Sequence, residues 1–233
     1  MYNGKMKALT FSYDDAVTQD IRLIEILNKY NLKCTFNLNS GFLGSSNTLI
    51  RENVEVGHHK IKEEDIKHVY EGHEVAAHTI THPCVTRLTD WAVVNEVEQD
   101  RLRLSELVGY EIVGMAYPGG GDTLYDERVA NIIKNKTGIK YARVTKGTEN
   151  FDLQDNLYTF HPTIHHHHNW DKLYELGQKF INMTPDKPQI FYIWGHSYEF
   201  DICDDWDKFE EFCKFISNKD DIFYGTNKEI LIK

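Results

Sequence analysis

The stretch Gly72-His73-Glu74-Val75-Ala76-Ala77-His78-Thr79-Ile80-Thr81-His82-Pro83 decides how this chain is organised. Residues 73–77 form a short run that ends in three apolar residues and predicts a strand. A helical pattern that Thr89 or Asp90 could cap then runs to about Val108. Strands that alternate with helices are typical of a largely parallel sheet or a barrel. Two histidines follow this strand, where such folds collect their ligands.

The same alternation extends in both directions along the chain. Apolar runs predict strands at 6–13, 34–38, 73–77, 111–117, 141–144, 157–160 and 189–194. Helical spacing predicts helices at about 21–30, 63–71, 90–108, 126–135, 170–182 and 206–217, and a polar, irregular region lies before about residue 60. We therefore expect a single α/β domain over residues 1–233.

Length, composition and charge narrow the class of protein. The chain has 233 residues, of which 41% are hydrophobic and 27% are charged, which is ample for a buried core. The 36 acidic and 26 basic side chains give a net charge of −10, which argues against a general nucleic-acid binder. The longest apolar run, at 190–194, has the length of a strand and is too short to span a membrane.

The amino-terminal residues and the cysteines bear on the compartment. The first seven residues show no signal peptide, which predicts a cytoplasmic protein, although a trimmed secreted chain would begin in the same way. Cys34, Cys84, Cys203 and Cys213 include no C-x-x-C pair. We expect reduced and mostly buried thiols rather than a disulfide or a thiolate–metal site.

Polar residues follow several predicted strands, and a parallel sheet would bring them to one edge. They are Asp14 and Asp15 after the first strand, His78 and His82 after the third, a Gly-rich turn after Tyr117, and His196 after the late strand. His78 and His82 are four residues apart, so one helical turn would point both imidazoles the same way. With one carboxylate they would form a metal site that keeps positions open for water and substrate.

Four motifs in this order resemble those of the polysaccharide deacetylases, the NodB-homology group or carbohydrate esterase family four. They are TFSYDDA at 10–16, the stretch at 72–83, YPGG at 117–120 and WGH at 194–196. The resemblance covers about residues 6 to 200, and the second motif is the most specific. It implies that residues 1–233 form one polysaccharide-deacetylase-like catalytic domain with a distorted (β/α) barrel, and that the protein is a metal-dependent deacetylase. The expected substrate is an N- or O-acetylated carbohydrate of the N-acetylglucosamine type.

The resemblance also implies roles for individual residues. Asp15, His78 and His82 would hold a divalent metal, commonly zinc, with cobalt or nickel also suitable. Asp14 would be the general base on the metal-bound water, which is the nucleophile and whose pKa the metal lowers. His196 would protonate the departing amine.

Other residues near the motifs are candidates for contact with the substrate. The Gly119 N–H, in the turn after Pro118, would help to stabilise the oxyanion. The candidates for a substrate-binding groove are Tyr117, Pro118, Tyr198 and His161. The alternative is that these side chains serve packing or lie in an exposed loop. The histidine run at 165–168 either lines the same groove or forms an exposed loop that picks up metal.

One position departs from the family pattern. The third motif usually carries an arginine two residues before the proline, where it orients the catalytic aspartate, and here that position is Ala116. Either activity is lost or another cation fills the role. Arg143, in the predicted strand at 141–144, is our candidate because it could reach the same edge, with an ordinary surface arginine as the alternative.

Other functions stay open beside the deacetylase. The absence of the motif arginine leaves room for a non-catalytic carbohydrate-binding relative. Another metal-dependent C–N hydrolase could use the same scaffold. A non-haem iron enzyme is a further alternative, because two histidines and one carboxylate also describe its metal site. Asp14 and His196 disfavour the iron enzyme, which does not need this extra acid and base.

Overall fold

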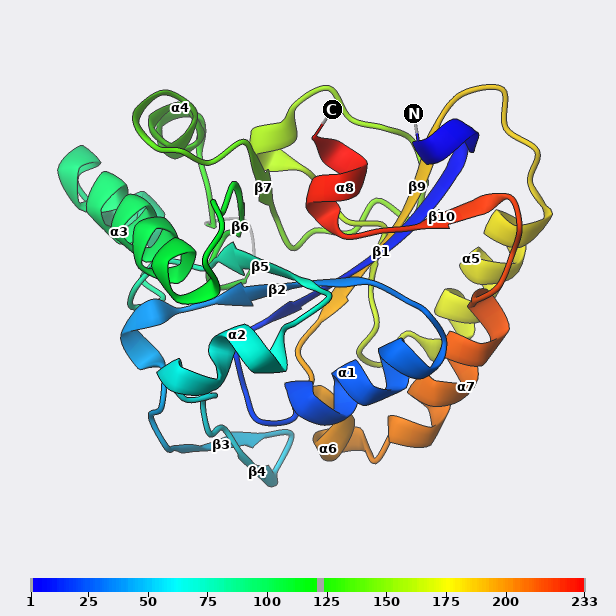
Figure 1. Ribbon diagram of the computed structural model, residues 1–233, viewed down its shortest axis with the longest axis horizontal. Helices are drawn as coiled ribbons and strands as arrows, with labels where there is room; N and C mark the ends of the chain where they lie inside the picture. Colours follow the sequence, from blue (N-terminus) through cyan, green and yellow to red (C-terminus); the bar gives the residue numbers. More distant parts are fainter. Residues whose placement is uncertain (1, 121–123, 233) are drawn as a thin grey trace.

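A curled parallel sheet forms the centre of the molecule in the computed structural model, which describes residues 2–120 and 124–232 (Figure 1). Its order is β7-β6-β5-β2-β1-β9-β8, with β10 beside the start of β1. The strands are β1 (Lys7–Asp14), β2 (Cys34–Leu38), β5 (Glu74–Ala77), β6 (Gly114–Ala116), β7 (Tyr141–Arg143), β8 (Ile164–His165), β9 (Gln189–Gly195) and β10 (Ile222–Tyr224). Every pair is parallel, so the carboxyl ends of the strands share one edge.

One segment, residues 160–165, links the two ends of this sheet. The Phe160 N–H donates to the Ala142 carbonyl of β7 at 2.9 Å, and Ile164 and His165 then pair with β9. A sheet whose ends are joined in this way curls into a distorted barrel. The predicted α/β class and distorted (β/α) barrel are therefore confirmed.

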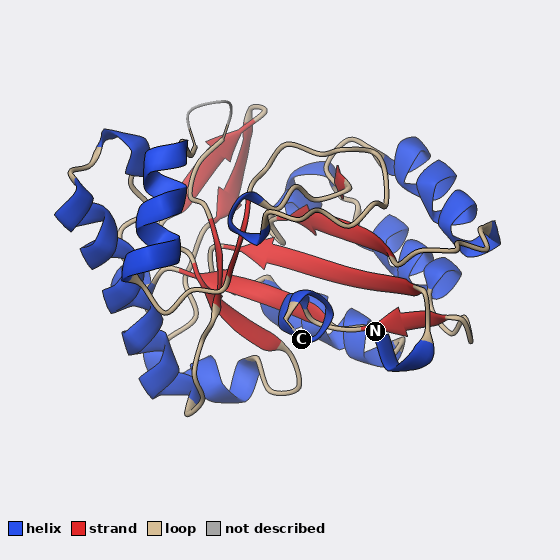
Figure 2. Cartoon of the chain, turned by 90° about the horizontal axis from the view of Figure 1, so that it is seen from above, coloured by secondary structure: helices blue, strands red, loops and turns tan. Residues whose placement is uncertain are grey.

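Most helices cover the outside of the sheet (Figure 2). They are α1 (Asp20–Lys29), α2 (Ile66–Val69), α3 (Asp90–Val108), α4 (Glu127–Lys136), α5 (Trp170–Asn182), α6 (Glu199–Cys203) and α7 (Trp206–Ile216). In α7, Phe209, Phe212 and Ile216 recur at helical spacing and are buried in the main core. Burial of each such side chain stabilises the fold by about 1.5–3 kcal/mol.

The last helix, α8 (Asn227–Leu231), packs instead against the start of the barrel strands. Ile230 and Leu231 lie in a small apolar cluster with Ala8 and Ile190, which stand near the starts of β1 and β9. The Asn227 N–H donates to the Thr35 hydroxyl at 2.9 Å. This helix therefore closes the end of the barrel that lies away from the carboxyl ends of the strands.

Two segments differ from the prediction. Residues 157–160 are not a strand, because Leu157–Thr159 forms a 3-10 helix in which the Asn156 side chain accepts the Tyr158 N–H. The irregular region before residue 60 contains a hairpin of β3 (Thr48–Arg51) and β4 (Val54–Gly57). Most side chains of this hairpin are exposed. Strand prediction relies on the alternation of buried apolar and exposed polar residues, so it does not detect a hairpin with so little buried surface.

The structure also bears on two further expectations, the reduced cysteines and the absence of a membrane span. Cys34 and Cys213 are buried, Cys203 is half-buried and Cys84 is exposed, and none of the four forms a disulfide. Among the described residues, no helix is both long enough and apolar enough to cross a membrane.

Candidate functional site

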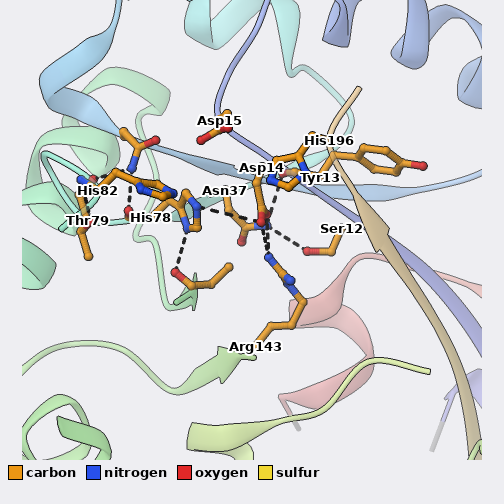
Figure 3. Close-up of polar contacts among 12 residues, drawn as sticks. Ser12, Tyr13, Asp14, Asp15, Asn37, His78, Thr79, His82, Arg143 and His196 are labelled. Atoms are coloured by element: carbon orange, nitrogen blue, oxygen red, sulfur yellow. Dashed lines mark hydrogen bonds and ion pairs between the residues drawn. The ribbon is translucent and has the colours of Figure 1, made fainter. Parts of the chain in front are cut away.

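The carboxyl ends of the barrel strands bring the predicted metal ligands, base and acid close together (Figure 3). These residues border one cavity of about 440 Å³. Asp14 ends β1, the loop after β5 contributes His78 and His82, and His196 follows β9. All of them line this cavity together with Asp15. A second cavity of about 360 Å³ also borders Asp15 and His82, so open space lies on both sides of these two residues.

Asp15, His78 and His82 form a compact trio. One donor atom from each residue can be chosen so that all three lie within 4.8 Å of one another. The Nδ1 of His78 is 2.9 Å from the Ala116 carbonyl, which can only accept a hydrogen bond, so Nε2 keeps its lone pair. Burial lowers the pKa of His78 to about 4, which keeps the imidazole in the neutral form that binds metals. This donor set fits a divalent metal such as zinc.

The loop that carries the two histidines is not a helical turn, contrary to the prediction. Thr79 and His82 have positive φ angles of 67° and 55°, and the two imidazole centroids are 4.9 Å apart. The Asn39 amide holds the loop by donating to the carbonyls of His78 and Thr79, at 2.6 and 3.0 Å. Side-chain contacts therefore maintain a backbone conformation that non-glycine residues rarely adopt.

The carboxylate of Asp15 lies between two basic groups. Its Oδ2 is 3.4 Å from the His58 Nε2, and the Lys60 ammonium donates to its backbone carbonyl at 2.6 Å. Burial alone would raise the pKa of Asp15. The hydrogen bond with His58 and the charge of Lys60 outweigh it and hold that pKa well below its usual range. Sequence reasoning missed both basic residues, which follow the unpredicted hairpin.

Asp14 lies beside the trio and is held by Arg143. One guanidinium nitrogen of Arg143 is 2.7 and 2.5 Å from the two carboxylate oxygens, and the Asn37 amide donates to Oδ1 at 2.8 Å. The Asp14 Oδ2 is 3.9 Å from the His78 Nε2. Arg143 is fully buried, and its guanidinium lies 4.6 Å from the Trp194 ring centroid. The structure therefore places Arg143 against the carboxylate and not on the surface.

The register of the sheet explains how an arginine on β7 reaches this position. Arg143 is the direct neighbour of Ala116 on β6. Paired residues on adjacent strands project from the same face of a sheet. The small side chain of Ala116 and the long side chain of Arg143 thus stand side by side at the carboxyl end of the barrel.

His196 is paired with Glu199, which begins α6. The His196 Nδ1 is 3.1 Å from one carboxylate oxygen of Glu199, and the backbone N–H of His196 donates to the other oxygen at 2.9 Å. Burial would lower the pKa of His196, but the charge and hydrogen bond of Glu199 outweigh it and raise that pKa to about 9. Sequence reasoning missed Glu199, although its spacing of three residues from His196 was a usable signal.

The histidine run at 165–168 divides between two environments. The His165 Nε2 is 2.9 Å from Glu199, and buried His166 has its Nδ1 3.3 Å from the Trp194 carbonyl. His167 and His168 instead contact Glu52 at the turn of the hairpin. The first two histidines therefore support the surroundings of His196, and the other two form a separate cluster.

The remaining predicted residues fall into two groups. Gly119 and Tyr198 line the cavity, and the positive φ of Gly119, 93°, suits glycine. Pro118 is buried, and Tyr117 is fully buried and donates to the Tyr158 carbonyl at 2.9 Å. His161 contacts the Lys146 carbonyl at 3.0 Å. Within the described ranges, Tyr117, Pro118 and His161 do not line the cavity, so we assign these three to packing and loop contacts.

Comparison with known proteins identifies the family of this chain. The family model described as Polysaccharide deacetylase matches residues 2–142. The chain belongs to the polysaccharide deacetylase family. Among curated proteins there is no match.

Several solved structures share the fold of this family member. The Streptococcus pyogenes deacetylase PplD in complex with acetate is 19% identical, with 64% of this chain and 61% of that chain covered and a TM-score of 0.53. The Xyl-CE4 domain of a multidomain xylanase from the hindgut metagenome of Trinervitermes trinervoides is 14% identical, with 96% and 89% covered and a TM-score of 0.58. The chain thus spans about three fifths of the length of PplD.

A further neighbour shows that the fold also occurs without activity. It is BA3943 from Bacillus anthracis, described as a CE4 family pseudoenzyme. It is 16% identical, with 97% of this chain and 66% of that chain covered and a TM-score of 0.56. Activity therefore has to be argued from the site residues of this chain and not from the fold.

Proposed function

We propose that this protein is a metal-dependent deacetylase that hydrolyses N-acetyl or O-acetyl groups of a carbohydrate. The observation that carries the proposal is the contact between Arg143 and Asp14. It supplies a positioned carboxylate beside the metal-binding trio although Ala116 occupies the place of the motif arginine.

Asp15, His78 and His82 would hold a divalent metal, with Zn²⁺ as the first candidate and Co²⁺ or Ni²⁺ as alternatives. Such an ion would polarise the acetyl carbonyl and make a water molecule beside it more acidic. The neutral imidazole of His78, the ionised carboxylate of Asp15 and the nearby ring of His82, all beside open space, support this assignment.

Asp14 acts as the general base of the proposed reaction. Its carboxylate accepts the proton of the attacking water, and its Oδ2 lies 3.9 Å from the His78 Nε2, within reach of a group at the trio. Arg143 and Asn37 fix the direction of the carboxylate through hydrogen bonds. Asp14 and Arg143 are both buried, and each neutralises the charge of the other, which would otherwise be unpaired away from water.

His196 acts as the general acid. With a pKa of about 9 it carries a proton at neutral pH, and it can deliver that proton to the departing amine or alcohol. The proton gained by Asp14 and the proton given by His196 balance over the reaction. The Gly119 N–H, on the turn that lines the cavity, is the candidate donor to the oxyanion.

The two cavities beside the trio suit a sugar that continues in both directions. They share Asp15 and His82, and Tyr198 lies on the wall of one and Phe42 on the wall of the other. Aromatic rings present an apolar face to a sugar ring and a polar group to its hydroxyls. An acetylated oligosaccharide is therefore the substrate class that we propose.

A non-catalytic carbohydrate-binding protein is the second candidate, because Ala116 lacks the motif arginine and one structural neighbour is a pseudoenzyme. We favour catalysis because Arg143 occupies the position beside Asp14. The pair of His196 and Glu199 also favours deacetylation over an iron oxygenase, which would not need this acid.

The variant Asp14→Asn tests the proposal. We expect acetate release from acetylated oligosaccharides to fall by about 10²–10⁴-fold, because the base is lost while the metal ligands remain. The metal content should stay unchanged. Asp207→Asn, on the exposed face of α7, is the matched control. Full acetate release by Asp14→Asn would overturn the assignment of the base.

A further inference from the structure

Four side chains from a hairpin turn, a loop and the end of a short helix meet at the edge of the cavity, which Glu52 and His167 line. Glu52 stands in the turn between β3 and β4, His167 and His168 follow β8, and Cys203 ends α6. One donor atom from each can be chosen so that all four lie within 4.8 Å of one another. This group, the Glu52–Cys203 cluster, shares no residue with the trio.

The contacts inside the Glu52–Cys203 cluster assign the imidazole protons. The two carboxylate oxygens of Glu52 are each 2.8 Å from one imidazole, at the Nε2 of His167 and the Nε2 of His168. An ionised carboxylate only accepts, so both Nε2 atoms carry hydrogen. In the neutral rings the Nδ1 atoms then keep their lone pairs, and both lie 3.9 Å from the Cys203 Sγ.

These distances fit a metal of the zinc type. Zn–N bonds of about 2.1 Å and a Zn–S bond of about 2.3 Å at a tetrahedral angle place nitrogen and sulfur about 3.6 Å apart. Both Nδ1–Sγ distances are within a few tenths of an ångström of that value. A carboxylate on the far nitrogen is the usual outer partner of a metal-bound histidine.

The backbone at the Glu52–Cys203 cluster also points to a function. Glu52 and Asn53 form a two-residue hairpin turn with positive φ angles of 54° and 64°, and His168 has a φ of 56°. Glycine and asparagine suit such positions, whereas glutamate and histidine cost about 1–2 kcal/mol there. Two of the clustered side chains thus occupy strained positions, which are common at functional sites.

We propose that the protein has a second metal site, in which His167, His168 and Cys203 bind a divalent ion of the zinc type and Glu52 orients the two imidazoles. Thiolate and imidazole ligands select zinc over magnesium or calcium. Glu52 and His167 also line the cavity that holds Asp14 and Asp15. An ion at this site would therefore join the hairpin, the histidine loop and α6 into one fixed wall of the substrate groove.

Cobalt titration of the metal-stripped protein tests this proposal. We expect two equivalents of Co²⁺ per chain and a thiolate-to-cobalt charge-transfer band in the near ultraviolet, which the trio cannot produce because it has no sulfur ligand. Cys203→Ser should lose the band and one equivalent. Cys84→Ser, at an exposed cysteine, should keep both. His78→Gln should lose the other equivalent and keep the band.

The variant Glu52→Gln adds a graded measurement. It should keep the charge-transfer band but weaken Co²⁺ binding at this site by about 10–100-fold, because an outer carboxylate tunes its ligands. Absence of the band in the wild-type protein, or an unchanged band in Cys203→Ser, would overturn the second site. Circular dichroism of each variant checks folding. The band does not depend on acetate release, so failure of this site and failure of the deacetylase are distinguishable.

Discussion

The trio and the Glu52–Cys203 cluster use similar side chains but are held in different ways. Asp15 and His78 lie buried at the ends of β1 and β5, and Asn39, Lys60 and the Ala116 carbonyl fix their surroundings. In the second cluster, Glu52 and His168 are exposed. Their side chains contact chiefly one another and His167 and Cys203. Strand ends therefore prepare a site before a ligand arrives, whereas the hairpin, the histidine loop and α6 need the ligand to join them.

The largest expected effect separates the two groups by activity. His78→Gln removes a ligand of the trio and should lower acetate release by more than about 10³-fold, because the metal supplies several kcal/mol of transition-state stabilisation. His168→Gln, in the Glu52–Cys203 cluster, should lower it by less than about tenfold, since it changes only the wall of the groove. Comparable losses in both variants would contradict the division of labour.

The next effect concerns stability and compares two ion pairs of the same cavity. Arg143→Met leaves the buried carboxylate of Asp14 without its partner and should lower the free energy of unfolding by about 3–5 kcal/mol. The side chain of Arg51 is 47% exposed and pairs with Glu199. Arg51→Ala should therefore lower the free energy of unfolding by only about 0–1 kcal/mol. Urea denaturation measures both. Adding Asp14→Asn to Arg143→Met should recover part of the stability but none of the activity.

A smaller effect is expected at the proposed acid. Glu199→Gln removes the charge that raises the pKa of His196, so the alkaline limb of the kcat profile should move to lower pH. The rate at neutral pH should fall by about 10-fold because less His196 is protonated. Profiles of both proteins between about pH 6 and 10 measure the shift. A limb at the same pH in both would show that Glu199 does not control the acid.

The smallest expected effect is the pH dependence of folding in the metal-stripped protein. The pKa of His196 is raised from 6.5 to about 9 in the folded state. Its contribution to stability is therefore fully present below about pH 6.5 and is lost as the pH rises through about 9. The Tm of the wild-type protein should fall over this range more than that of His196→Gln. Parallel curves would contradict the proposed origin of the raised pKa.

The sequence predicted the parts of the site that depend on single strands. Alternating apolar and helical patterns located β1, β2, β5 and β9, and the polar residues after them meet because parallel strands end at one edge. The position of Arg143 could also be predicted, because this residue belongs to the strand next to Ala116. These inferences need only local periodicity and the topology of the fold.

The contacts between loops could not be predicted in the same way. Glu52 stands in an exposed hairpin, and Cys203 is a single cysteine at the end of a short helix. Neither has a periodic signal or a paired motif, and the expectation of mostly buried thiols passed over Cys203. The carbonyl of Ala116 that orients His78 is likewise invisible in residue types. Such contacts arise only when the barrel brings distant segments together.

Acetate release from a panel of N- and O-acetylated oligosaccharides, with the protein metal-loaded or treated with chelator, tests the central proposal most directly. We expect acetate from at least one member of the panel, loss of release by more than about 10³-fold after chelation, and recovery when Zn²⁺ or Co²⁺ is restored. Absence of acetate from every member by the metal-loaded protein, or release that chelator leaves unchanged, would contradict a metal-dependent deacetylase.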